Sequence, residues 1–384
     1  MRAASNRRFG GRGGGRRGGG GGAADLYLLN PATAIFARAS TGTYRPTANS
    51  LALAATDVAR MESGLYLIEK YATNLVWPSR DITHAQYQAG SGVTTTADVL
   101  DGPDGATLAA DQSNVNSGGY GRYRQASGVG RGAATIWRRR PSGAGTGTHQ
   151  VRFGSAGFET GYRDTASETW ERITLIQPNA SSTGNGLFPA WSFALTANFG
   201  QNMIAVAQNI VTDLLHSEQG VGYPTSTILA PTGTTSRETD ILTWLAAEVP
   251  LELREGKSLW SVRPCYASSQ IISGETRILG SWGGLTDVLR LRHDGTGVLF
   301  EALTSTTVRA ASGYVTFSAD QLMTVRADAA AATLAVAGAT TGNGAGAAGT
   351  PWAWLAGVGF RLGGVFGGSG NEIDGGIGLP AVTA

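Results

Sequence analysis

The sequence predicts an all-β protein with two antiparallel sandwich domains. Of its 384 residues, 41% are apolar and only 15% are charged, so apolar surface is ample for ordinary cores and the charges typical of helical surfaces are few. The 57 glycines, together with many Thr and Ser residues, favour short strands and tight turns. A chain of this length is expected to form two or three domains.

The N-terminal segment has a different composition from the rest of the chain. Residues 1–24 carry many glycines and no acidic residue. Such a segment cannot bury enough apolar surface to offset the entropy of ordering, which predicts a flexible arm. The arm acts either as a tether or, alternatively, as an RNA-binding Arg-Gly tract that uses phosphate contacts and stacking. Its six arginines are Arg2, Arg7, Arg8, Arg12, Arg16 and Arg17.

Charge and cysteine content exclude several function classes. Outside the arm the chain has 24 basic and 28 acidic residues, and a mildly acidic body is a poor nucleic-acid surface. We expect no membrane insertion, because no run of about 18 apolar residues occurs. Arginine and glycine stand where a signal peptide would have its apolar core, so export by the usual pathway is not expected. The single cysteine, Cys265, rules out an internal disulfide framework.

The first domain is expected from about residue 80 to residue 228, after connecting strands in 34–79. Residues 101–105 (Asp-Gly-Pro-Asp-Gly) are a strong turn signal. Residues 149–153 alternate apolar and polar side chains with period two, as does a strand with one wet face. Strands are also expected at 133–139, 169–174, 188–199 and 203–215, the last of which also fits a helix by length.

The second domain is expected over 229–384, entered through a linker rich in Thr, Pro and Gly. Its clearest element is a hairpin in which 289–292 and 298–302 flank the turn Asp294-Gly295. A second pair is expected between 322–327 and 333–337, although the alanines at 329–332 intrinsically favour helix. Residues 358–366 are expected to close the sandwich.

Three phrases of the sequence point to one kind of protein. They are Phe-Ala-Arg-Ala-Ser-Thr-Gly-Thr-Tyr at 36–44, a segment from 60 to 75 centred on Gly-Leu-Tyr-Leu-Ile-Glu, and a set of short pieces between 218 and 240 that includes Arg-Glu-Thr-Asp at 237–240. Their order and spacing resemble the joints of head-spike and tail-fibre proteins of tailed bacteriophages and gene-transfer-agent particles. In that family a carbohydrate-module-like jelly roll is followed by a concanavalin- or laminin-G-like sandwich.

The resemblance implies a structural virion appendage. Residues 1–33 would anchor the chain to a capsid, vertex or tail protein, 80–228 would be the jelly roll, and 229–384 the lectin-like sandwich. The protein would sit on the virion surface after assembly in the cytoplasm of the producing cell, as a homo-oligomer (trimer or pentamer) with other spike or fibre subunits as partners. It would help attachment to host polysaccharide through multivalency. Two alternatives stay open: an adaptor that binds only virion subunits, and a sugar-binding secreted protein or glycosidase.

Catalytic and metal signatures are absent from the sequence, so we expect no enzyme. A glycosidase needs two carboxylates across a cleft, and nothing in the sequence pairs Asp101, Asp104, Glu168, Glu171, Asp287 or Glu301. The four histidines lack metal-ligand spacing. No cofactor is expected. Calcium at the acidic turn 101–104 is the one metal left open, although two carboxylates alone do not make a site of six or more oxygens.

Aromatic residues beside arginines are the best candidates for contact with a glycan. Aromatic faces stack on pyranose rings, and arginine suits acidic polysaccharide. The neighbourhood that combines both holds Tyr120, Arg122, Tyr123, Arg124 and Trp137. The alternatives for this neighbourhood are a subunit contact and plain surface.

Overall fold

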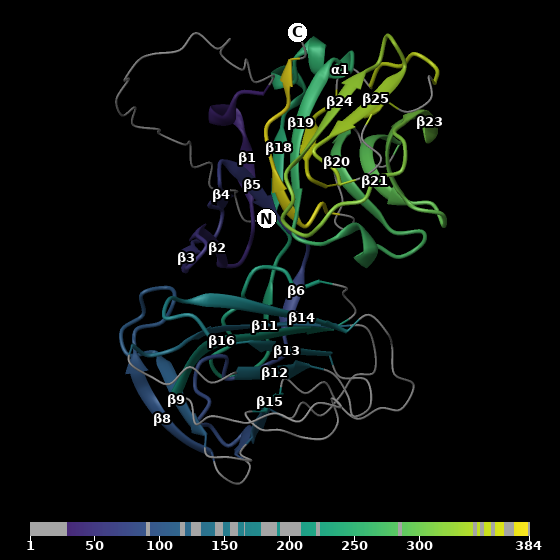
Figure 1. The fold of residues 1–384 in the computed structure, drawn as a ribbon. Helices are drawn as coiled ribbons and strands as arrows, with labels where there is room; N and C mark the ends of the chain where they lie inside the picture. Colours follow the sequence, from purple (N-terminus) through teal and green to yellow (C-terminus); the bar gives the residue numbers. More distant parts are fainter. Residues whose placement is uncertain are drawn as a thin grey trace, which may run out of the picture. The chain divides into compact units, whose positions relative to one another are not determined.

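The computed structural model describes residues 29–89, 93–115, 120–123, 132–142, 149–153, 160–164, 166–177, 190–192, 209–219, 223–282, 286–340, 344–345, 349–354, 358–364 and 372–382. The predicted fold class is confirmed: these residues form antiparallel β-sheets, and the helical segments are short, such as α1 (Leu251–Arg254). Figure 1 shows the strands and their labels.

The chain divides into two compact units. Unit 1 contains the described residues of 29–39, 57–70 and 239–382, and unit 2 contains those of 40–56 and 71–238. The chain therefore passes between the units four times, after residues 39, 56, 70 and 238. Residues 34–79, expected to be connecting strands, supply strands to both units.

Unit 1 is built on two large sheets. One has seven strands in the order β1-β18-β27-β20-β21-β22-β23, and the other has eight, in the order β26-β25-β24-β19-β28-β5-β4 with β29 also pairing with β19. The strands of the first are β1 (Ile35–Ala37), β18 (Ile241–Trp244), β20 (Thr276–Trp282), β21 (Asp287–His293), β22 (Val298–Thr304), β23 (Thr307–Ala311) and β27 (Phe360–Leu362). Those of the second are β4 (Met61–Glu62), β5 (Leu65–Ile68), β19 (Ser258–Pro264), β24 (Met323–Asp328), β25 (Thr333–Ala337), β26 (Gly344–Ala345), β28 (Gly375–Ile377) and β29 (Ala381–Val382).

Aromatic side chains fill the core of unit 1. Trp282 stacks on Trp354 with ring centroids 4.0 Å apart, and it meets Trp260 edge-on at 6.4 Å. Gly280 lies where these rings crowd the sheet, because a Cβ there would stand 2.7 Å from both Trp260 and Phe360. Strand β19 alternates buried and half-buried residues along its whole length, which is the period-two pattern of a strand with one core face.

Both hairpins predicted in the second domain are present in unit 1. Strands β21 and β22 pair from Val288–Leu303 to His293–Val298 around the Asp294-Gly295 turn, which confirms the first. Strands β24 and β25 pair over five residues each, which confirms the second. The alanines at 329–332 form a turn rather than a helix, and the Asp328 carboxylate accepts a hydrogen bond from the Ala331 amide across that turn.

Unit 2 also contains two five-stranded sheets, which lie one over the other (Figure 1). The first has the order β13-β12-β15-β10-β7 and the second the order β14-β11-β16-β9-β8. Strands of the first are β7 (Tyr87–Ala89), β10 (Tyr120–Tyr123), β12 (His149–Phe153), β13 (Thr160–Asp164) and β15 (Ala190–Ser192). Strands of the second are β8 (Val93–Leu100), β9 (Ala110–Val115), β11 (Gly132–Arg139), β14 (Glu171–Gln177) and β16 (Asn209–Gln219).

Two short ribbons complete unit 2. Strand β2 (Gly42–Thr47) pairs with β3 (Ser50–Ala54), and β6 (Ala72–Asn74) pairs with β17 (Thr235–Arg237). Strand β17 lies within the segment expected to be a linker. It forms there because residues 235–237 find a partner strand at 72–74, a non-local pairing that local sequence does not reveal.

Candidate functional site

The predicted contact residues Tyr120, Arg122 and Tyr123 lie on strand β10, within the first sheet of unit 2. Arg122 pairs with Gln88 of β7 and Ala190 of β15. Ala190 in turn pairs with Arg152 of β12, which places the two arginine positions two strands apart at the same level of the sheet. Arg124 and the six arginines of the arm lie outside the described residues.

The register separates this sheet into two faces of different chemistry. Paired residues share a face, and successive residues of a strand alternate between faces. One face therefore carries the positions Gln88, Tyr120, Arg122, Gln150, Arg152 and Arg163, which we call the arginine face. The opposite face carries Tyr87, Tyr123, Val151, Phe153, Tyr162 and Trp191.

Burial identifies which face packs on the core. Tyr87 is buried, and its hydroxyl donates to the Pro78 carbonyl at 2.5 Å. Tyr123 pairs with Tyr87 and shares its face. The register thus puts the Tyr120, Arg122, Arg152 and Arg163 positions on one face of the sheet and the Tyr123 position on the other.

Trp137 is not a surface residue, which corrects its place in the sequence-derived site. It lies on β11 with 0% exposure and packs against Leu51, Trp170 and Leu214. Its indole N–H donates to Thr227 Oγ1 at 3.3 Å. The glycines and arginines around Trp137 in the sequence indicated exposure, but both faces of β11 are covered, and residues 132–138 are all buried.

We expect Trp137→Ala to destabilise unit 2 by about 3–5 kcal/mol, because it empties a buried indole site. Urea unfolding measures the effect. Tyr71→Ala is the matched control, since Tyr71 is an exposed aromatic residue of the same unit and its loss is expected to cost no more than about 1 kcal/mol. Equal effects of the two substitutions would contradict the core assignment.

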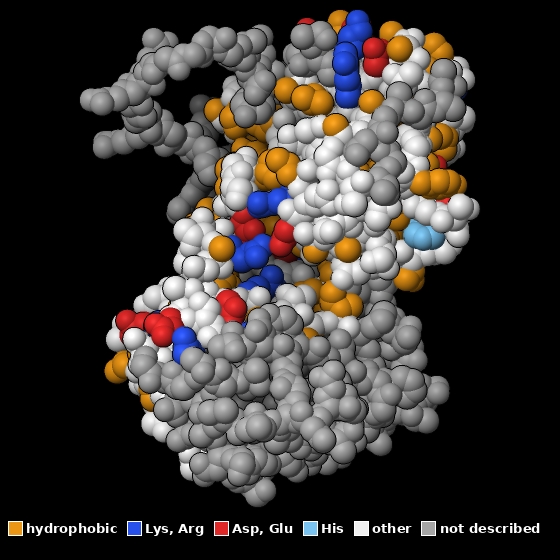
Figure 2. Space-filling view, viewed as in Figure 1, with side chains coloured by type: hydrophobic (Ala, Val, Ile, Leu, Met, Phe, Trp, Pro, Cys, Tyr) orange, Lys and Arg blue, Asp and Glu red, His pale blue; other side chains and the backbone are white. Residues whose placement is uncertain are grey.

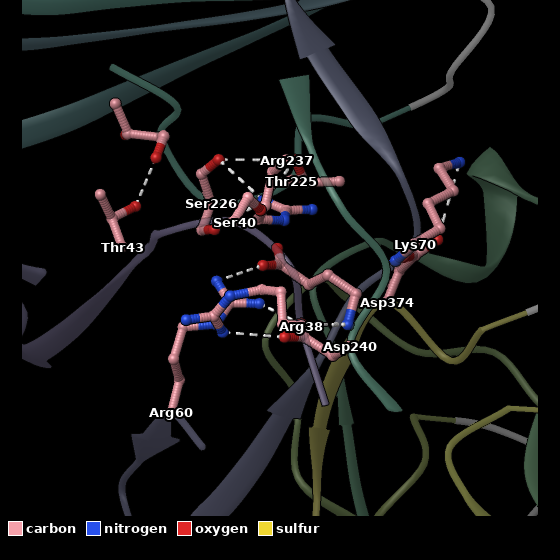
Figure 3. A network of polar contacts seen from close by, with 12 residues as sticks. Arg38, Ser40, Thr43, Arg60, Lys70, Thr225, Ser226, Arg237, Asp240 and Asp374 are labelled. Carbon is pink, nitrogen blue, oxygen red and sulfur yellow. Dashed lines mark hydrogen bonds and ion pairs between the residues drawn. The ribbon is translucent and has the colours of Figure 1, made fainter. Parts of the chain in front are cut away.

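A buried ionic cluster in unit 1 is the most elaborate polar site among the described residues. Asp240 accepts from Arg38 at 2.9 Å and also from Arg60, and Arg60 reaches Glu69 at 2.7 Å. Figure 3 shows the two guanidinium groups converging on the Asp240 carboxylate. Backbone bonds tie the same residues together, since the Glu69 amide donates to the Asp240 carboxylate and the Asp240 amide donates to the Glu69 carbonyl.

Arg361 and Glu372 extend the cluster and balance its charge. Arg361 donates to the Asp240 carbonyl at 3.2 Å and to Glu372 at 3.1 Å. Three arginines thus face three carboxylates (Glu69, Asp240 and Glu372), and all six side chains are at most 2% exposed. We call these six residues the Asp240 cluster.

The two ends of the Asp240 cluster differ electrostatically. Burial alone would lower the pKa of Arg60, but the charges of Asp240 and Glu69 outweigh it, so the pKa is raised. At Arg361 burial dominates over Glu372, and the pKa is lowered. Both guanidinium groups stay charged, because arginine does not deprotonate in proteins at ordinary pH.

A second polar cluster lies in unit 2 and joins residues 218, 225, 226 and 237. The Glu218 carboxylate accepts from the Thr225 amide at 2.7 Å and from its hydroxyl at 2.6 Å. Arg237 donates to the Thr225 hydroxyl at 3.1 Å and to the Ser226 hydroxyl at 2.8 Å (Figure 3). We call Glu218, Thr225, Ser226 and Arg237 the Arg237 cluster. These hydrogen bonds give the buried Glu218 carboxylate and the Arg237 guanidinium polar partners inside the unit, as buried polar groups need.

The carboxylates considered for glycoside hydrolysis all have local structural partners. Asp104 pairs with Arg80, Glu168 with Arg140, Glu171 with Arg138, and Glu301 with both Arg290 and Arg292. Asp101 accepts from the Leu108 amide and Asp287 from the Thr286 hydroxyl. No group of three or more His, Cys, Asp or Glu residues is arranged to hold a metal within the described part of the chain.

The sequence analysis missed both buried clusters as structural sites. Their signal was present in the three phrases, which contain Arg38, Arg60, Glu69, Arg237 and Asp240.

None of the helices in the described ranges has the length and hydropathy of a membrane span. The chain matches no family model and no curated protein.

Proposed function

We propose that this protein is a structural appendage of a phage or phage-like particle, either a head spike or a tail fibre. Its N-terminal arm holds it on the particle, and its body contributes to attachment to host cell-surface polysaccharide. The observation that carries the proposal is the burial of the residues that resemble such proteins.

Five residues of the three phrases are buried members of the two clusters. Arg38, Arg60, Glu69, Arg237 and Asp240 are each at most 2% exposed. Arg38, Glu69, Arg237 and Asp240 also lie within two residues of places where the chain passes from one unit to the other, and Arg60 lies four residues after such a place. A resemblance at such positions concerns the buried polar groups of each unit, which is a property of a fold and less easily met by chance than surface similarity.

The arginine face supports the attachment role. Guanidinium groups pair bidentately with carboxylates and phosphates, so positions 122, 152 and 163 suit a polysaccharide that carries acidic groups. Each contact is weak alone. Repetition of the face on an oligomer fixed to one particle gives avidity through high effective concentration.

We expect deletion of residues 1–24 to abolish incorporation into particles, because the deletion removes the anchoring arginines. Immunogold electron microscopy of released particles, with antibody against residues 80–384, measures this. The matched control keeps the full length of the arm and replaces its six arginines by serine. It distinguishes the effect of removing the arginine charges from the effect of shortening the arm. Absence of label from every wild-type particle would overturn the proposal.

The same preparation separates the adaptor alternative. An adaptor would label particles normally and show no affinity for host polysaccharide. A secreted sugar-binding protein would bind polysaccharide without labelling particles.

A further inference from the structure

An exposed tyrosine in unit 1 is held in a fixed position. Tyr314 is 49% exposed, yet its hydroxyl donates to Asp294 Oδ2 at 2.8 Å. Val315, the next residue, is buried and bridges to Val298. Both the hydroxyl of Tyr314 and the backbone of the next residue are therefore held at the β21–β22 hairpin.

Gly297 provides the surface on which the Tyr314 ring rests. A Cβ at Gly297 would stand 3.0 Å from Cδ1 of Tyr314 and 3.3 Å from its Cγ. Gly297 does not have a positive φ, so its backbone conformation alone does not call for glycine. A larger residue at position 297 would have to push the Tyr314 ring away by a few tenths of an ångström, so glycine suits the close approach of the ring.

The turn beneath the ring is itself rigid. Asp294 Oδ1 accepts from the Thr296 amide at 2.8 Å and from the Gly297 amide at 3.1 Å. The bond from the Thr296 amide, then the bonds from Tyr314 and the Gly297 amide, lower the pKa of Asp294. A carboxylate therefore adjoins the ring, and it keeps a lone pair available for a further donor.

A neighbouring turn adds polar groups to the same surface. The Gly274 amide donates to the His293 carbonyl at 2.9 Å, and the His293 amide donates to the Glu275 carbonyl at 3.1 Å. Ser273 is exposed, and its hydroxyl lies 3.5 Å from where a Cβ on Gly295 would stand. His293 Nδ1 accepts from the Gly295 amide, so the neutral ring presents Nε2–H as a donor.

From this geometry we propose that Tyr314, with Asp294, Ser273 and His293, is a binding platform for a neutral pyranose unit of a polysaccharide. A fixed, flat aromatic ring offers the apolar face of a sugar a contact that costs little conformational entropy. The carboxylate, hydroxyl and imidazole offer hydrogen bonds to sugar hydroxyls. An anionic sugar is disfavoured, because the nearest fixed charge is Asp294 and because Arg292 already pairs with Glu301.

The exposed aliphatic residues of unit 1 lack this organisation. Figure 2 shows apolar side chains at several separate places on the visible face of unit 1, which is normal for a protein surface. Leu251 and Leu322, for example, are more exposed than Tyr314. As aliphatic residues, they provide no flat face for stacking on a sugar ring.

The test uses the full-length protein and measures its affinity for neutral oligosaccharides built from glucose, galactose, mannose or N-acetylglucosamine, and for polysaccharide purified from host cells. We expect Tyr314→Ala to weaken binding about tenfold for at least one neutral probe. Tyr314→Phe keeps the ring and is expected to retain most of the affinity. Tyr71→Ala, at an exposed tyrosine of unit 2, is the matched control and is expected to change nothing.

Three results would overturn the inference: no neutral probe bound by the wild type, binding unchanged in Tyr314→Ala, or a change of oligomeric mass as the sole effect of that substitution. The inference rests on the proposed attachment function, and the two fail separately. Host polysaccharide binding that is lost in variants of the arginine face, with no neutral probe bound in a Tyr314-dependent way, would leave the attachment function standing and reject the platform. Unlabelled particles together with Tyr314-dependent sugar binding would do the reverse.

Discussion

Asp240→Ala is expected to destabilise unit 1 by about 3–5 kcal/mol, the typical cost of removing one partner from a buried ion pair. The carboxylate receives Arg38 and Arg60, whose side chains are both 0% exposed. Its removal deprives both guanidinium groups of the carboxylate that they share, in a site that water does not reach. The backbone bond from the Glu69 amide is lost as well. The change in the free energy of unfolding is measured by urea unfolding, with tryptophan fluorescence as the signal.

Glu168→Ala is the control for Asp240→Ala, because it also removes an acidic partner of an arginine. Glu168 pairs with Arg140 at 3.1 Å, and its side chain is 49% exposed. Exposed pairs contribute about 0–1 kcal/mol, so the control is expected to unfold near the wild-type midpoint. If Asp240→Ala also unfolds within about 1 kcal/mol of wild type, the Asp240 cluster does not stabilise unit 1 in the way described.

Local patterns in the sequence were sufficient to predict the fold class and several strands. The Asp294-Gly295 turn and the alternation in 289–292 identified the β21–β22 hairpin, because hairpin register depends on residues that are close in sequence. The alternation of residues 149–153 identified β12. Such signals need no knowledge of distant partners.

Distant partners explain what the sequence did not reveal. The pairing of β6 with β17 joins residues 72–74 and 235–237, and no local pattern encodes such a contact. Trp137 looked exposed because its sequence neighbours are arginines, yet Arg138 is itself buried against Glu171. Tyr314 and Asp294 are 20 residues apart, so their hydrogen bond was likewise invisible before the structure.

The arginine face shows how a site predicted from neighbouring residues is divided by strand geometry. Tyr120 through Arg124 are consecutive in the sequence, and a strand necessarily distributes such a run over two faces. The register groups position 122 with positions 152 and 163, which lie 30 and 41 residues later in the chain, and puts position 123 on the other face. Arginine positions that are dispersed along the sequence thereby fall on one face of the sheet.

Reversal of charge at two of these positions, Arg122→Glu with Arg152→Glu, is expected to weaken binding to acidic host polysaccharide by more than about a hundredfold. Like charges brought together across an interface cost several kcal/mol, and each tenfold loss corresponds to about 1.4 kcal/mol. Wild-type affinity should also fall as salt rises, because screening weakens exposed charge pairs. The measurement is binding of the full-length protein to immobilised polysaccharide at two salt concentrations.

The matched control for this reversal changes the same net charge elsewhere. Lys257 and Arg326 are exposed residues of unit 1, so Lys257→Glu with Arg326→Glu alters the total charge without altering the arginine face. Equal losses in both double variants would mean that overall charge, and not this face, governs attachment. A loss confined to Arg122→Glu with Arg152→Glu, together with a weaker salt dependence, would locate acidic-glycan recognition on the sheet. Acidic sugars would then bind unit 2 and neutral sugars unit 1. Multivalent attachment favours such an arrangement, since each weak contact raises the effective concentration for the other.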